Sequence, residues 1–379
     1  MRRRRWWKSV FIIVVTVIIL SCITFPSSTR TTTDREPWPP KPKPLERSSV
    51  SEEVHKDTSW WQFFLCNLKQ HHIAEEASNA HRLHILHRDT APSHKNTNVF
   101  LIDTACNSRP KFRAWCSIES WAQVNPSLQI WFVMTSATIS DFEGFPSKLL
   151  QKYSNLNIVG ADVEKMVEDT PLKQLFDSKK WTQNNTWPVE LLSDMMRVLV
   201  LWRWGGIYSD TDVVSIRPFD LPLNSLGYET DFQIGSAVYS FEAQQSVMWR
   251  LMKDMVNGFM PELWGSIGPK AITRVVKAMC GVEDLQTLLP KTPVICGGVT
   301  LHPRQTFYPV DYTQSKKFFT KNRGIRFEKT FRHSHAIHFW NKMSKELMVT
   351  KGDNSLYEVA AKKYCPITYS EATQEADTF

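Results

Sequence analysis

The chain lacks a surplus of basic residues in the part that is expected to fold, although its formal net charge is +8. Arg2–Arg5 and Lys8 supply five of these charges with no acidic residue among them, and residues 26–56 hold six basic against five acidic residues. The rest of the chain is close to neutral, whereas proteins that track a phosphate backbone carry a basic face. We therefore expect no nucleic-acid partner.

An apolar run of the ~20 residues that usually cross a bilayer is also missing. The nearest is the run 10–25, which follows the basic flank and the Trp6–Trp7 pair. These tryptophans can lie at the membrane interface and extend the span. A cleaved signal peptide, with an apolar core of about 7–15 residues, is the alternative. No small-x-small cleavage site precedes Pro26, so we predict a cytoplasmic tail at 1–8, a transmembrane anchor at 9–25 and a lumenal remainder.

The sequence has no CxxC pair, so its cysteines do not predict a zinc site. Cys22 lies in the predicted anchor. The other six cysteines are an even number, and in an oxidising compartment we expect them to form disulfides. Their connectivity stays open, although the short separation of Cys280 from Cys296 favours that pair. The sequon at 184–186 is an acceptor site for an N-glycan.

The composition changes along the chain, and no internal repeat is visible. Residues 26–95 begin with a stretch rich in proline, serine, threonine and charge, and we assign them to a lumenal stem. Residues 96–379 form the expected folded domain. Apolar runs predict strands at 99–103, 128–134 and 156–159, a strand, break and strand over 206–216, and helices at 110–123, 189–204, 244–258 and 268–280. This alternation predicts an α/β fold with a mainly parallel sheet.

The stretch "GGIYSDTDVV" at 205–214 carries two carboxylates, Asp210 and Asp212, one residue apart. On an extended strand they point to the same side, and two like charges so close are tolerated when a cation lies beside them. Oxygen ligands favour Mg²⁺ or Mn²⁺. Gly205 and Gly206 would let the backbone approach a ligand. The alternative is a surface turn at a strand end, where aspartate is common.

The helix expected at 189–204 is apolar on nearly every side, so it is predicted to be buried. Asp194 and Arg197 lie inside it, three positions apart and on one face. Buried charges need partners. These two either neutralise each other or belong to the site that follows directly in the sequence.

Together, "SDMMRVLVLWRWGGIYSDTD" resembles the donor-site signature of sugar transferases with a DxD motif. The wider chain, from Val99 to Pro366, resembles the animal α1,4-glycosyltransferases. The stretches that carry this resemblance are "CSIESWAQVNP", "WGSIGPKAITRVVKAMC", "GGVTLHPRQTFYPV" and "AIHFWNK". The resemblance implies a GT-A-like, nucleotide-sugar-binding catalytic domain at 96–379 that retains the donor's configuration and forms an α1,4 linkage.

The resemblance also implies roles for particular residues. Asp210 and Asp212 would bind Mn²⁺, or another divalent cation, together with the diphosphate of a UDP-sugar donor, and His338 would be a third ligand. Asp194 would accept hydrogen bonds from the donor sugar, and Arg197 would contact sugar or diphosphate oxygens. The donor-binding set would further include Gly205, Gly206, Tyr208 and Trp340.

The resemblance leaves the reaction open in several respects. The expected activity is transfer of galactose or N-acetylgalactosamine to a glycosphingolipid in the Golgi. Transfer of N-acetylglucosamine to O-glycans of glycoproteins is the alternative, and a catalytically silent UDP-sugar-binding or chaperone-like Golgi protein is another. A homodimer or a Golgi enzyme complex is a possible assembly. Relatives often carry Asn-Gly where this chain has Gly235-Ser236, so the sugar pocket is expected to differ.

The basic flank predicts a single-pass type II Golgi membrane protein with its N-terminus in the cytosol. Protease added to sealed microsomes should therefore leave the main domain intact and digest it only after detergent is added. Digestion of that domain in intact microsomes would refute this topology.

Overall fold

The computed structural model describes residues 80–182, 187–322 and 324–379. The predicted tail, the predicted anchor at 9–25, most of the stem and the sequon lie outside the described residues. Within the described ranges, no helix combines the length and the apolar character that crossing a membrane requires.

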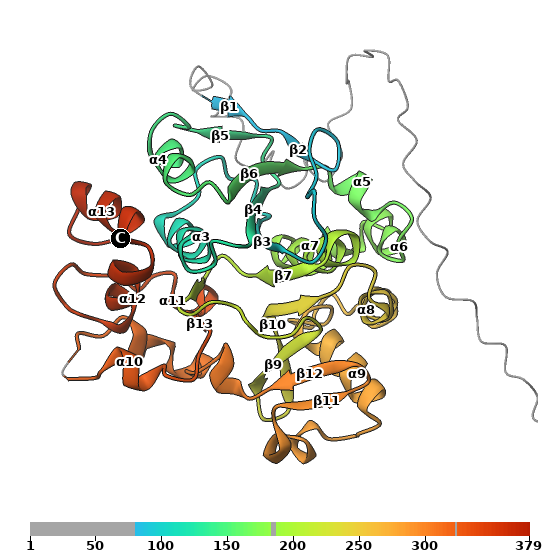
Figure 1. Cartoon of the computed structure of the whole chain (residues 1–379). Helices are drawn as coiled ribbons and strands as arrows, with labels where there is room; N and C mark the ends of the chain where they lie inside the picture. The colour runs from blue at the N-terminus through green and yellow to red at the C-terminus, as the bar shows by residue number, and fades with distance from the viewer. Residues whose placement is uncertain (1–79, 183–186, 323) are drawn as a thin grey trace, which may run out of the picture. The chain divides into compact units, whose positions relative to one another are not determined.

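The main sheet holds nine strands (Figure 1). They are β2 (Ile85–Leu86), β3 (Asn98–Asp103), β4 (Gln129–Met134), β6 (Leu156–Ala161), β7 (Gly206–Ser209), β9 (Ser225–Thr230), β10 (Gln233–Phe241), β11 (Val294–Cys296) and β12 (Val299–His302). Their order is β11-β12-β9-β10-β7-β3-β4-β6-β2. Five neighbouring pairs are parallel and three are antiparallel. The predicted α/β class with a mainly parallel sheet is therefore confirmed.

Two small sheets flank the main one. β1 (Ala80–Arg82) pairs with β5 (Thr138–Ser140), and β8 (Val213–Ser215) pairs with β13 (Ala336–His338). β1 and β2 precede residue 96, where the sequence analysis begins the folded domain, and β2 is an edge strand of the main sheet. The folded domain therefore extends at least to Ala80, because a short apolar segment inside the polar stem completes the sheet.

Four of the α-helices were predicted from the sequence, at 110–123, 189–204, 244–258 and 268–280, and their observed bounds agree to within a few residues. The α-helices are α3 (Phe112–Val124), α4 (Phe145–Lys152), α5 (Val163–Val167), α6 (Leu172–Asp177), α7 (Pro188–Trp204), α8 (Ser246–Asn257), α9 (Pro269–Cys280), α10 (Phe327–Thr330), α11 (Asn341–Ser344), α12 (Leu356–Tyr364) and α13 (Pro366–Glu375). The 3₁₀ turns are η2 (Lys180–Thr182), η3 (Leu285–Thr287), η4 (Leu289–Lys291), η5 (Arg304–Thr306) and η6 (Tyr312–Phe318).

Both faces of the sheet are covered, which explains why its central strands read as continuous apolar runs. In β3, Phe100 and Ile102 belong to a core shared with α7, α8 and α9. Val99 and Leu101 point to the opposite face and join a second core with α3 and α12. Figure 1 shows these two groups of helices on the two sides of the strands. α7 lies entirely in the first core, as its apolar surface predicts.

Disulfides tie distant parts of the domain together. Cys280 and Cys296 are bonded, as predicted, and join the end of α9 to β11. Cys116 in α3 is bonded to Cys365, which precedes α13. Cys106 is disulfide-bonded as well.

We expect loss of the Cys116–Cys365 bridge to destabilise the protein more than loss of the Cys280–Cys296 bridge. The first spans 249 residues of sequence and the second 16, and a longer closed loop restricts the unfolded chain more strongly. The double substitution C116S/C365S should lower the unfolding free energy by about 2–5 kcal/mol. Thermal and denaturant unfolding of both double variants measures this. The reverse order of stabilities would contradict the expectation.

Candidate functional site

The strand order reverses between β3 and β7. The chain runs outward from β3 through β4 and β6, then returns to β7 on the other side of β3, parallel to it. Ligands of open α/β sheets bind beyond the carboxyl ends of the strands at such a reversal. Because β7 ends at Ser209, the next residue, Asp210, lies at this point.

Asp210, Asp212 and His338 form a cluster in which one possible ligand atom from each lies within 4.8 Å of the others. β7 ends at Ser209 and β8 begins at Val213, so the two aspartates lie in a turn. The alternation expected for a continuous strand therefore does not bring them together. β13 pairs with β8 so that His338 is opposite Val213, and His338 Nε2 lies 3.2 Å from Asp212 Oδ1.

The donor set of this cluster fits a divalent cation. Two carboxylates favour a hard ion such as Mn²⁺ or Mg²⁺, and an added imidazole is a common ligand of transition metals. His338 Nδ1 is buried and has no hydrogen-bond partner within the part of the chain that the structure describes. A half-buried acid pair with a buried, unsatisfied imidazole is the arrangement that a bound cation would complete.

The two aspartates differ in electrostatic environment. Burial raises the pKa of Asp210, and the charge of Asp212 adds to this effect against the opposing charge of Arg197. Burial also disfavours the charged form of Asp212. The charge of His338 nevertheless holds its pKa below the ordinary value, helped by the N–H of Asn341, which donates to Oδ2 at 2.6 Å. Asp212 is thus held as a carboxylate, and Asp210 is the member of the pair that most lacks compensation.

Arg197 is buried and forms ion pairs with Asp194 and Asp210. Its Nη2 lies 3.2 Å from Asp194 Oδ1 and 3.3 Å from Asp210 Oδ1. Nη1 donates to the carbonyl and the hydroxyl of Ser236 at 2.8 and 3.0 Å, and Nε donates to the carbonyl of Ser193 at 3.3 Å. The guanidinium is therefore fully engaged by protein groups. It positions two carboxylates at once. Arg197 and Asp194 neutralise each other, as one interpretation of the sequence expected, and Arg197 also contacts Asp210 of the acidic site, as the other expected.

Asp194 lies where α9 begins. A Cβ on Gly268, the residue before α9, would lie 2.6 Å from both carboxylate oxygens of Asp194, so only glycine leaves room for the carboxylate there. Burial raises the pKa of Asp194 to about 6, and the charge of Arg197 opposes the rise. The carboxylate therefore lies at the edge of the site, near both Arg197 and the first turn of α9.

The other predicted donor-binding residues differ in what they touch. The hydroxyl of Tyr208 donates to Asp210 Oδ1 at 2.5 Å, and its ring lies under the guanidinium of Arg197. Trp340 packs on His338 with ring centroids 4.0 Å apart, and its Nε1 donates to the carbonyl of Val310 at 2.9 Å. Both side chains support the cluster from within the protein.

Gly205 and Gly206 are required by the backbone conformation and by packing within the fold. Gly205 and Gly206 have φ of 65° and 113°, which end α7 and turn the chain into β7. A Cβ on Gly205 would lie 2.0 Å from Asn96 Oδ1, and one on Gly206 2.2 Å from the carbonyl oxygen of Asn98. The two glycines were expected to let the backbone approach a ligand. In the structure they let it approach Asn96 and Asn98.

Sequence reasoning missed Tyr308, whose ring packs against Gly235 in the segment that the sequence analysis singled out. Tyr308 accepts hydrogen bonds from the N–H groups of Ala237 and Val238 at 3.0 and 3.1 Å. A Cβ on Gly235 would lie 2.3 Å from its hydroxyl oxygen. A side chain at position 235 would therefore clash with Tyr308, and Ser236 accepts hydrogen bonds from Arg197 through its carbonyl and its hydroxyl. In the sequence, the only indication of this arrangement was that Gly235-Ser236 stands where relatives often carry Asn-Gly.

Comparisons with known proteins agree with this site. Residues 111–233 match the family described as "Glycosyltransferase sugar-binding region containing DXD motif". Residues 240–372 match "Alpha 1,4-glycosyltransferase conserved region". The α/β fold and the acidic cluster thus belong to a glycosyltransferase.

Relatives of known activity indicate which kind of glycosyltransferase this chain resembles. Human alpha-1,4-N-acetylglucosaminyltransferase is 31% identical over 288 residues, which cover 74% of this chain and 81% of that protein. Lactosylceramide 4-alpha-galactosyltransferase of Rattus norvegicus is 29% identical over 282 residues, covering 73% and 76%. The chain belongs to the α1,4-glycosyltransferase family, as the resemblance in its sequence predicts.

Solved structures of glycosyltransferases are more distant. The PaToxG glycosyltransferase has a TM-score of 0.37 and 20% identity, covering 48% of this chain and 69% of that chain. The galactosyltransferase LgtC, in complex with donor and acceptor sugar analogs, has a TM-score of 0.30 and 14% identity, covering 64% and 86%.

Replacing Arg197 by methionine should destabilise the protein by about 3–5 kcal/mol, because the buried Asp194 would lose its ion pair and the half-buried Asp210 would keep only the hydrogen bond from Tyr208. Denaturant unfolding of the purified protein measures the change. The control is K173A, which removes an exposed ion pair with Asp177 and should cost less than about 1 kcal/mol. If R197M unfolded as K173A does, Arg197 would not be the charge that balances the two carboxylates.

Proposed function

We propose that this protein transfers galactose or N-acetylgalactosamine from a UDP-sugar to the terminal sugar of a glycosphingolipid. The reaction would depend on Mn²⁺, retain the donor's configuration and form an α1,4 linkage in the Golgi. The observation that carries this proposal is the cluster of Asp210, Asp212 and His338 at the reversal of the strand order. The glycolipid acceptor is supported by the named activity of the lactosylceramide galactosyltransferases among the relatives.

Each part of the site has a task in this reaction. Asp210, Asp212 and His338 would hold the cation, which would stabilise the negative charge on the departing diphosphate. Tyr208 and Arg197 hold Asp210 in place, so the ligands are oriented before the donor arrives. Asp194 would accept a hydrogen bond from a hydroxyl of the donor sugar, and Arg197 would act through the two carboxylates that it touches.

Two routes lead to retention of configuration. In the first, the acceptor attacks on the face that the diphosphate leaves, and a departing phosphate oxygen takes the acceptor's proton. The second uses a carboxylate of the enzyme as nucleophile and forms a covalent glycosyl-enzyme. We favour the first, because Asp210 and Asp212 are the proposed metal ligands and Asp194 is held by Arg197.

N-acetylglucosaminyl transfer to O-glycans is the second candidate, because the human relative with 31% identity is named for transfer of that sugar. A donor panel separates the candidates. The full-length protein with Mn²⁺ would be given UDP-galactose, UDP-N-acetylgalactosamine and UDP-N-acetylglucosamine, each with lactosylceramide or with an O-glycan acceptor. Preference for the third donor on the O-glycan would replace our proposal, and absence of hydrolysis and transfer with every pair would favour a catalytically silent protein.

Asp212→Asn should abolish transfer and leave the protein folded. The amide keeps the size of the side chain but removes the charge that faces His338 and the cation. Loss of one well-placed electrostatic group typically costs about 10²–10³ in rate, and loss of the metal should cost more. Mn²⁺-dependent turnover of the preferred UDP-sugar measures the effect.

Thermal melting is the folding control for this variant, and Asp177→Asn, at an exposed aspartate, is the matched substitution. A D212N protein that melts normally and keeps most of its turnover would overturn the assignment of the metal site.

A further inference from the structure

Positive charge gathers in one segment of the folded domain. Residues 312–332, which we call the basic segment, contain seven lysines and arginines and a single acidic residue, Glu328. Residues 57–379 together are nevertheless close to neutral. The cation cluster and the residues that support it use none of these basic side chains. Such an uneven distribution of charge creates a local potential that attracts a partner of the opposite sign.

Most of the basic side chains in this segment have no acidic partner. The one acid of the segment, Glu328, is paired with Lys363 of α12 at 2.8 Å, and Lys321 lies 3.4 Å from Asp353. The other basic side chains of the segment that the structure describes are exposed and form no ion pair within the described ranges. They are Lys316, Lys317, Arg326, Lys329 and Arg332. Their charges are therefore available to an anionic partner from outside the domain.

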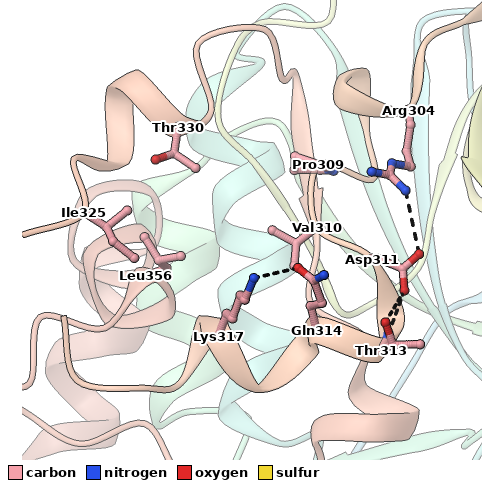
Figure 2. A pocket seen from close by; sticks show the side chains of 10 residues that line it. All are labelled: Arg304, Pro309, Val310, Asp311, Thr313, Gln314, Lys317, Ile325, Thr330 and Leu356. Atoms are coloured by element: carbon pink, nitrogen blue, oxygen red, sulfur yellow. Dashed lines mark hydrogen bonds and ion pairs between the residues drawn. The ribbon is translucent and has the colours of Figure 1, made fainter. Parts of the chain in front are cut away.

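The basic segment lines a cavity of about 510 Å³ (Figure 2). Lys317 comes from η6, Ile325 precedes α10, and Leu356 begins α12. In Figure 2 the apolar side chains of Ile325 and Leu356 lie at one end of the cavity, and the charged side chains of Arg304 and Asp311 lie at the other. The cavity thus joins the two halves of the basic segment, and its volume is in the ~300–1,000 Å³ range of small-molecule sites.

Large apolar side chains are exposed beside these charges. Ile325 is 50% exposed and Tyr312 is 42% exposed. On α11, which packs against η6, Met343 is 54% exposed. Lysine and arginine next to exposed aliphatic and aromatic groups are typical of protein surfaces that lie at the boundary between lipid head groups and acyl chains. The segment therefore combines the electrostatic and the apolar attraction through which proteins bind a membrane surface.

This surface begins next to the cation cluster. The ring centroid of Tyr312 lies 6.0 Å from that of Trp340, and Trp340 packs on His338 with ring centroids 4.0 Å apart. Trp340 also donates to the carbonyl of Val310, which lines the cavity. A domain that docked through the basic segment would therefore hold the cation cluster close to the surface on which it docked.

We propose that the basic segment docks on a bilayer with anionic phospholipid head groups, and that the cavity takes one of these head groups. A bilayer is favoured over an acidic protein because the predicted anchor at 9–25 would keep the domain beside one. Each basic side chain near such a surface strengthens association about fivefold. The anchor raises the effective concentration of the surface, so a moderate affinity is enough to orient the domain. The inference goes beyond the proposed function and does not depend on which sugar is transferred.

The test maps which lysines the bilayer covers. Full-length protein is reconstituted into nanodiscs of phosphatidylcholine, alone or with about 30% phosphatidylserine, and the acylation rate of each lysine is measured by mass spectrometry. Lys316, Lys317 and Lys329 should react at least about threefold more slowly on the anionic discs, because the head groups cover them. About 0.5 M NaCl should remove this difference, since it shortens the Debye length to about 4 Å.

Three lysines that are exposed elsewhere in the domain are the internal reference, and their rates should be equal on both kinds of disc. They are Lys152, Lys180 and Lys291. Because all six rates come from one sample, a general effect of the lipid on the reagent would change the reference lysines as well.

The triple variant K316Q/R326Q/K329Q removes three charges of the basic segment that lack an ion pair, and it should weaken docking by about 10². The slowing at Lys317 should therefore be lost. The matched control K152Q/K180Q/K291Q removes the same charge from other parts of the surface and should keep the slowing. Both variants change exposed side chains, so both should melt as the unmodified protein does.

Equal lysine rates on the two kinds of disc would overturn the inference and leave an acidic protein as the partner of the basic segment. Slowing that persists in high salt, or that includes the reference lysines, would also overturn it. Loss of the slowing in both triple variants would mean that net charge, and not this surface, attracts the bilayer. The donor panel judges the proposed function separately, since it depends on turnover and this test does not.

Discussion

The site depends on one balance of buried charge. Asp194, Asp210 and Asp212 lie in or beside the core, and Arg197 and His338 are the cations that touch them. Removing charges from water is costly unless they are paired and hydrogen-bonded. Here the guanidinium of Arg197 is shared between two carboxylates, and Asp212 is shared between an imidazole and a backbone N–H. Burial raises the pKa of Asp210 in spite of Arg197, so a cation beside it would offset a charge that the protein compensates only in part.

This balance determines how the surrounding chain is built. α7 has to bring both Asp194 and Arg197 to one face while it is buried on nearly every side. The hairpin of β9 and β10 gives up regular pairing so that Ser236 can reach Arg197. Gly268 lacks a side chain so that the Asp194 carboxylate can fit against the start of α9. Such features would destabilise an ordinary sheet or helix. Here each of them accommodates a charged side chain of the site.

The C-terminal segment completes the cluster from a distance in the sequence. β13 pairs with β8 rather than with the main sheet, and this pairing places His338 against Asp212. Asn341 then donates to the same aspartate, while Trp340 and Tyr308 pack around the imidazole. The disulfide between Cys116 and Cys365 joins the C-terminal helices to α3, whose Ser120 hydroxyl accepts a hydrogen bond from the backbone of β8. The position of His338 is therefore supported by both ends of the domain.

Local patterns in the sequence predicted the central elements of the fold, and the resemblance of longer stretches indicated the family. Apolar runs and helical periodicity determine the strands β3, β4 and β6 and the helices α3, α7, α8 and α9, because burial on one or both faces requires those residues. The spacing of Asp210 and Asp212 left a cation site and a surface turn open, and the resemblance to the DxD-containing transferases favoured the cation site.

Only the tertiary structure decided how these residues meet. The turn at 210–212 replaces the predicted strand alternation, and Gly205 and Gly206 pack against Asn96 and Asn98 instead of a ligand. The contact of Arg197 with Ser236 lies within a register shift of β10. Register, bulges and the pairing of β13 with β8 depend on contacts between residues far apart in the chain, and no local pattern contains that information.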